Sequence, residues 1–122
     1  MARVGEVMAL IVALLCVLIV ADIAEAATYN VGDAGGWAFN VANWPQGKKF
    51  AAGDVLVFKY NSAFHNVVTV DSNGYQSCAA SSGDPTVQTG NDQITLTKGD
   101  HFFICGIPGH CDRGMKISVH VD

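Results

Sequence analysis

Short apolar or alternating runs, each ending at a turn signal, recur from residue 27 to the end of the chain. Runs of this length and pattern predict strands, because alternation over four to eight residues is typical of half-buried β-structure. No segment of this part of the chain shows a sustained helical period. The expected strands cover residues 27–31, 55–60, 66–70, 93–97, 101–105 and 116–121.

The run 55–60 is the strongest strand, because it is apolar on nearly both faces, as a strand in a sandwich core would be. Residues 71–91 are rich in Ser, Gly, Asp and Asn, so we expect an irregular connection with a short helix or isolated strands. Turn signals return about every 8–12 residues. The pattern therefore predicts an all-β Greek-key sandwich or barrel of about seven strands.

Residues 1–26 have an arginine near their start, a long apolar run and a small-residue ending, which predicts a secretory signal peptide cut after Ala26. The alternative is a membrane anchor. However, Asp22 and Glu25 interrupt the run well short of the roughly 20 apolar residues that a spanning helix needs. We therefore expect cleavage, a mature domain covering residues 27–122, and no membrane anchor in it.

The charge balance excludes two classes of partner. The chain has 7 basic and 11 acidic residues, and removal of the leader takes away Arg3, Glu6, Asp22 and Glu25, which leaves 6 and 8, a net charge of −2. There is no basic patch of the kind that nucleic-acid binding requires. There is also no polybasic run that would hold the protein on an anionic membrane.

The cysteines point to a metal or a reactive thiol. Of the four in the chain, Cys16 leaves with the leader, so Cys78, Cys105 and Cys111 enter an oxidising compartment. The leftover thiol of an odd set is an intermolecular partner, a reactive group or a metal ligand. If Cys105 binds metal, Cys78 and Cys111 are left to form a disulfide, for which loop closure gives roughly 3–4 kcal/mol.

The loop 105–115 places a thiol, an imidazole and a thioether between two strands, as Cys105, His110 and Met115. These are the donors of a blue-copper centre, which one further imidazole completes. His65 is the candidate, because it lies at the rim between the strands 55–60 and 66–70. His101 and His120 are weaker rivals, since both lie on the polar faces of alternating strands.

Each donor also has a plainer interpretation. Cys105 could be a small buried hydrophobe, His110 a surface turn residue and Met115 a core residue. Zinc is the other metal to consider, because Cys105, His110, Cys111 and Cys78 make a Cys₃His set. We disfavour zinc, since the adjacent His110 and Cys111 would have to wrap one small ion and Met115 would have no role.

Several short motifs occur in a fixed order along residues 27–122, and together they resemble the plant phytocyanins, more narrowly the plantacyanin or basic blue protein subclass. They are Gly35-Gly36-Trp37, Trp44-Pro45, Ala52-Gly53-Asp54, His65-Asn66-Val67-Val68, Phe103-Ile104-Cys105, Pro108-Gly109-His110-Cys111 and Gly114-Met115-Lys116-Ile117.

The resemblance implies a cupredoxin-like fold with one type 1 copper ion bound by His65, Cys105, His110 and Met115. It also implies a disulfide between Cys78 and Cys111. All four ligand positions are filled here, whereas early nodulin-like relatives lack the set. One departure is the charge, because plantacyanins of the basic type are strongly positive and the mature chain is slightly acidic.

These features predict a monomeric one-electron carrier in the extracellular space or cell wall. It would dock an unknown redox partner near His110 and Ile107-Pro108. The alternative, which the resemblance also supports, is a secreted signalling or cell-wall interaction module in which copper is mainly structural. We reject an oxidase, and expect no enzyme, because four histidines without a paired cluster cannot build the additional copper centres of oxygen chemistry.

Overall fold

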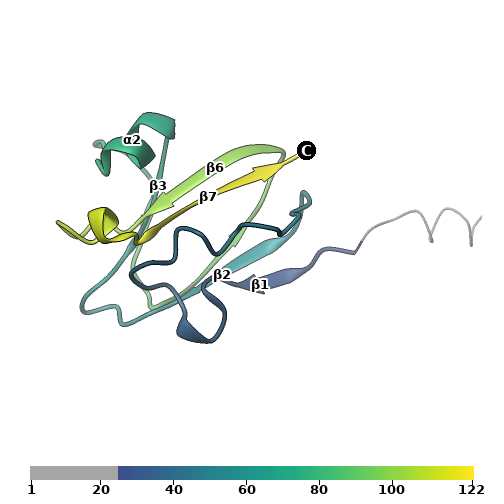
Figure 1. Cartoon of the computed structure of the whole chain (residues 1–122), viewed down its shortest axis with the longest axis horizontal. Helices are drawn as coiled ribbons and strands as arrows, with labels where there is room; N and C mark the ends of the chain where they lie inside the picture. Colours follow the sequence, from purple (N-terminus) through teal and green to yellow (C-terminus); the bar gives the residue numbers. More distant parts are fainter. Residues whose placement is uncertain (1–24) are drawn as a thin grey trace, which may run out of the picture.

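Two β-sheets face each other in the computed structural model, which describes residues 25–122 (Figure 1). The first sheet contains three strands and the second contains four. This arrangement confirms the predicted all-β fold of about seven strands, and of the two alternatives, sandwich and barrel, it is the sandwich. The first sheet holds β1 (Thr28–Asn30), β2 (Val55–Lys59) and β5 (Asn91–Thr95), and the second holds β3 (Val67–Val70), β4 (Thr86–Val87), β6 (Gly99–Ile104) and β7 (Lys116–Val121).

The strand order is β1-β2-β5 in one sheet and β4-β3-β6-β7 in the other. β1 runs parallel to β2, and the remaining pairs are antiparallel. The chain changes sheet three times, between β2 and β3, between β4 and β5, and between β5 and β6. The first of these crossings carries residues 60–66 over the end of the sandwich, and His65 lies within it.

Alternating side chains from the two sheets fill the core. In β7, Ile117, Val119 and Val121 are buried while the two residues between them are exposed. The Phe58 ring meets the Trp37 and Phe103 rings edge-on, with centroids 5.1 and 5.3 Å apart. Such edge-to-face contacts fix the relative position of the sheets, so the ends of the strands provide a rigid support for loops.

Two strands begin earlier than the pattern predicts. β5 starts at Asn91 and not at residue 93, and β6 starts at Gly99 and not at residue 101. Asn91 pairs with Lys59 in the ladder, and the neighbouring Asp92 is buried because Tyr60 and Thr89 donate hydrogen bonds to its carboxylate. Because these polar side chains have hydrogen-bond partners inside the fold, a search for alternating apolar residues does not find the start of this strand.

The irregular connection contains the short helix that its composition allowed. Helix α2 (Ser72–Ser77) begins at Asp71, whose carboxylate accepts a 2.7 Å hydrogen bond from Gly74 N. It ends at Cys78, which has a positive φ and forms a disulfide with Cys111. The predicted disulfide is confirmed. It joins the connection to η2 (Cys111–Arg113), a 3₁₀ turn in the loop 105–115; a second such turn, η1, covers Asp33–Gly35.

Nearly all of the predicted leader lies outside the described residues. Within residues 25–122, none of the helices has the length and apolar character needed to span a bilayer.

Candidate metal centre

Three candidate ligands converge at one end of the sandwich. The Nδ1 atoms of His65 and His110 lie 3.1 Å apart, and the Cys105 Sγ lies 3.9 Å from the first and 3.6 Å from the second. All three donor atoms fall within 4.8 Å of one another. The structure therefore brings together the residues that the sequence selected from two separate loops.

The His65 side is built by a tight turn after β2. The main-chain N–H groups of Phe64 and His65 both donate to the Asn61 carbonyl at 3.1 Å, and the Asn61 side chain accepts from Ala63 N at 2.9 Å. Asn suits this place because its short side chain bonds to nearby backbone. Only Asn66 separates His65 from the start of β3, so the strand limits how far the imidazole can move.

The Cys105 side is built by the end of β6 and the start of β7. Cys105 N donates to the Met115 carbonyl at 3.0 Å, which closes the neck of the loop, and Met115 N donates to the His110 carbonyl at 3.2 Å. Cys105 is 1% exposed and Met115 is fully buried in the same core cluster. The loop thus carries a buried thiol and a buried thioether at its base.

The segment after Phe39 fastens the far side of this loop. Asn40 N donates to the Arg113 carbonyl at 3.1 Å, and Val41 N donates to the Gly114 carbonyl at 3.0 Å. Gly114 has φ +82°, and a Cβ there would lie 3.0 Å from the Asn40 Cα. The close approach of the two backbones therefore requires glycine before Met115.

Asn66 ties the two halves of the centre together, a role that the sequence analysis missed. Its side-chain oxygen accepts from Gly106 N at 2.6 Å, while its main-chain carbonyl accepts from the Trp37 indole at 2.9 Å. Asn66, which follows His65, is thereby hydrogen-bonded to Gly106, which follows Cys105. The position of Asn66 directly after His65 was the available signal, although nothing in the sequence shows its partner.

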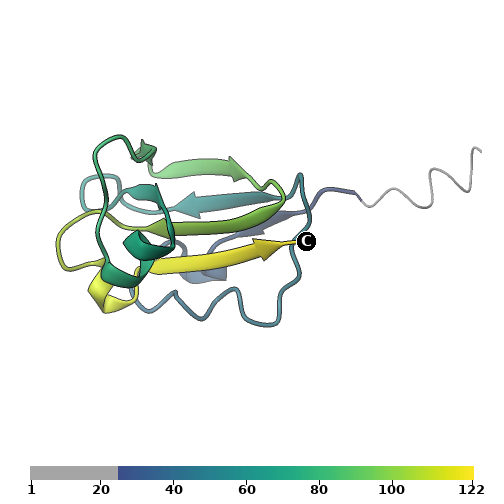
Figure 2. The ribbon, with the colours of Figure 1, turned by 90° about the horizontal axis from the view of Figure 1, so that it is seen from above.

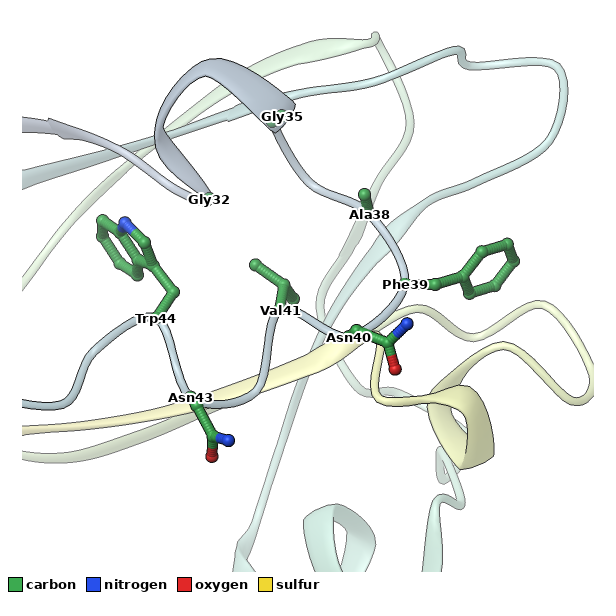
Figure 3. A pocket seen from close by; sticks show the side chains of 9 residues that line it. Gly32, Gly35, Ala38, Phe39, Asn40, Val41, Asn43 and Trp44 are labelled. Atoms are coloured by element: carbon green, nitrogen blue, oxygen red, sulfur yellow. The ribbon is translucent and has the colours of Figure 1, made fainter.

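Phe39 packs against both imidazoles. Its ring centroid lies 5.6 Å from that of His65 and 4.9 Å from that of His110, edge-on in both cases. The Arg113 guanidinium lies 4.0 Å from the same ring. Figure 3 shows Phe39 pointing away from Val41 and Trp44, toward the yellow loop that carries His110. The sequence analysis did not single out Phe39.

The surroundings of His65 favour its neutral imidazole. Burial lowers the pKa of His65, and the neighbouring His110 lowers that pKa further. A neutral ring keeps a lone pair available to a metal ion. One ion bonded to all three atoms at roughly 2.0–2.3 Å requires donors about 3–4 Å apart, and the observed separations satisfy this requirement.

The competing assignments do not fit. The Cys₃His zinc set is broken, because Cys78 and Cys111 are joined to each other. His101 bonds to the Thr97 carbonyl, and His120 lies between two carboxylates, so neither belongs to the centre. The neighbouring hollow of about 250 Å³ in Figure 3 is lined by no histidine, cysteine or acidic residue among the described ones.

Comparisons with known proteins agree with this geometry. Residues 36–115 match the model of the plastocyanin-like domain family. Chemocyanin from Lilium longiflorum is 56% identical over 98 residues, which cover 80% of this chain and 78% of the relative. Basic blue protein from Arabidopsis thaliana is 55% identical over 102 residues, which cover 84% of this chain and 79% of the relative.

A solved structure shows the same fold. Cucumber basic protein, a blue copper protein, superposes with a TM-score of 0.77 at 49% sequence identity, covering 78% of this chain and 99% of the cucumber chain. The His-Cys-His set and these relatives together support a type 1 copper centre. The chain therefore belongs to the plastocyanin-like family of blue copper proteins, and within it to the phytocyanins of the basic blue protein, or plantacyanin, type.

Proposed function

We propose that the protein is an extracellular one-electron carrier with a single type 1 copper ion. His65, Cys105 and His110 would bind the ion, and Met115 would supply a weak axial thioether. The convergence of the three donor atoms within 4.8 Å is the observation that carries this proposal. Copper, when bound there, supplies a redox couple that accepts one electron from a donor and passes one electron to an acceptor.

The chain's own contribution is a preorganised set of ligands. Cys105 and Met115 are buried at the base of the centre, whereas the two imidazoles are half-buried nearer the surface. The disulfide, the Asn66 bridge and the main-chain bonds to Asn40 and Val41 hold both loops in place. Ligands held this firmly move little when the charge of the ion changes, which keeps the cost of electron transfer low.

The exposed surface beside the imidazoles suits a docking partner. Pro108 and Gly109 are exposed and Ile107 is half-buried, and all three come just before His110. Phe64, next to His65, is 62% exposed and is one of two exposed large apolar residues among those described. We infer that a redox partner docks on this apolar rim, because the imidazole edges there give an electron the shortest exit from the buried thiolate.

Rapid mixing separates a carrier from a protein in which copper is structural. Reduced copper protein is mixed with a small one-electron oxidant, and the return of the visible copper band is followed in time. The carrier proposal predicts a second-order reaction that leaves the copper bound. Phe64→Ser should slow exchange with a partner that docks on the apolar rim, while leaving the band of the isolated protein unchanged.

The contrary result is electron exchange with the oxidant that is too slow for a carrier, with copper-free and copper-loaded protein binding the same cell-wall partner equally. That pair of results would show that copper has a structural role in an interaction module.

A further inference from the structure

Asp54 is a buried carboxylate that the copper centre does not use. It is 3% exposed, and each of its oxygens accepts a main-chain hydrogen bond: Oδ2 from Ala51 N and Oδ1 from Ala27 N, both at 2.8 Å. Among residues 25–122 the ion pairs involve only His120, so Asp54 has no cationic partner there. Buried charges are normally paired with an opposite charge, so this carboxylate lacks a counterion.

Both main-chain polar groups of Ala27 are held by hydrogen bonds near Asp54. The Ala27 carbonyl accepts from Val55 N at 2.9 Å, and its N–H donates to Asp54, so the nitrogen of this one residue is directed at the carboxylate. Ala27 is itself exposed. It is also the first residue after the small-residue ending that predicts leader cleavage.

We propose that Asp54 is a built-in receptor for the α-ammonium group that leader removal creates at Ala27. A leader peptidase adds one water to the Ala26–Ala27 peptide bond: the C–N bond breaks, a C–O bond forms, and Ala26 leaves as a carboxylate. The Ala27 nitrogen takes up a proton and becomes an ammonium at the position where its amide now donates. A hydrogen bond from a neutral amide to the carboxylate is thereby replaced by one from a cationic donor, which gives Asp54 the opposite charge that it lacks.

The register makes this device specific to one bond. A chain that began at Ala26 would keep a neutral amide at Asp54, and a chain that began at Thr28 would lose the donor altogether. The device lies far from the copper centre, because β1 runs parallel to β2 from Val55 toward Lys59, and His65 follows the far end of β2. Figures 1 and 2 show the chain reaching β1 at the end opposite the yellow loop.

The test is a two-by-two comparison of copper-loaded protein. Free Ala27 and N-acetylated Ala27 forms are prepared with Asp54 and with Asp54→Asn, since acetylation keeps the N–H donor and removes only the charge. We expect acetylation to lower the melting temperature by roughly 4–8 °C with Asp54 and by less than about 2 °C with the Asn variant. Equal losses in both backgrounds, or no loss with Asp54, would overturn the proposal.

Two further measurements do not depend on the Asn variant folding. A form extended by one residue, beginning at Ala26, should melt with the acetylated form, and a melting temperature equal to that of the free Ala27 form would contradict the proposal. Mass spectrometry of the full chain after secretion should find a mature protein that begins at Ala27. A start at any other residue would refute the specificity of the device.

Discussion

Two kinds of polar group are treated differently in this sandwich. Outside the candidate ligand set, Asp54 and Asp92 are buried and each accepts hydrogen bonds from the chain's own donors. At the centre, the facing donor atoms of His65, Cys105 and His110 have only one another as polar partners among the described residues. Groups that the chain satisfies are structural, whereas converging donors that it leaves to each other indicate a ligand.

The largest expected effect concerns the centre. Copper at about 1,000 times its Kd should stabilise the wild-type protein by about 4 kcal/mol, and Cys105→Ser should lose most of this gain because the thiolate is the strongest donor. The free energy of unfolding of the copper-free forms should agree within about 1 kcal/mol. Urea unfolding with and without copper measures both quantities.

His120→Ala is the matched control, because His120 is a histidine outside the centre. It should retain the full copper-dependent gain. If the Ser variant gained as much stability as the wild type, Cys105 would not be a ligand, and the contrast between the two kinds of polar group would fail.

The next largest effect concerns Asp92, whose buried carboxylate accepts hydrogen bonds from the chain's own donors. Tyr60→Phe removes a hydrogen bond to the buried Asp92 carboxylate, which should cost roughly 1–3 kcal/mol. Burial, followed by the bond to Asp92, raises the pKa of Tyr60 to about 12, from 10.0. The stabilisation is therefore complete below pH 10 and is lost as the pH rises to about 12.

Urea unfolding at several pH values between 9 and roughly 12 checks this sign. The Phe variant should lose less stability over that interval, and the remaining slope should come partly from Tyr75, whose pKa burial also raises. If the slope of the unfolding free energy against pH were the same in both proteins, the hydrogen bond from Tyr60 to Asp92 would not contribute to stability.

Met115 lies between the two categories, because it is a core residue and a candidate ligand at once. Met115→Leu conserves volume and should cost less than about 1.5 kcal/mol. It should keep the blue colour but raise the reduction potential, since a donor that favours the oxidised ion is removed. Protein-film voltammetry gives the potential, and an unchanged value would leave Met115 a core residue only.

The smallest effect lies on the surface of β7. The hydrogen bond that His120 donates to Asp100, followed by the one that it donates to Asp122, raises the pKa of His120 above 6.5. Its stabilising contribution is therefore complete below pH 6.5 and disappears as the pH rises through the folded value. An NMR titration should place the midpoint above 6.5, and Asp100→Asn should lower it more than Asp122→Asn.

The sequence predicted the features that local patterns encode. β7 matched its expected range, 116–121, because its alternation is strict, and three of the four candidate ligands share one loop. The start of β5 was wrong because Asp92 is satisfied by Tyr60 and Thr89, which an apolar pattern cannot show. A satisfied polar residue inside a strand therefore explains this error in the fold.

The supports of the centre could not be predicted for a related reason. Asn66 acts on Gly106, and Phe39 acts on two rings that come from different loops. Each contact joins residues far apart in the chain, so it exists only after the sheets have packed. The candidate ligands can be recognised in the sequence by their residue types. The residues that support them are of common types, and their role depends on their position in the fold.

A stoichiometric titration of the copper-free protein with Cu(II), followed by visible absorption, tests the central claim most directly. We predict one intense thiolate-to-copper band near about 600 nm that grows linearly to one copper per chain and then stops. Cys105→Ser should show no such band, while His120→Ala should show it in full. A wild-type protein that binds copper without this band, or that retains the band without Cys105, would contradict the account.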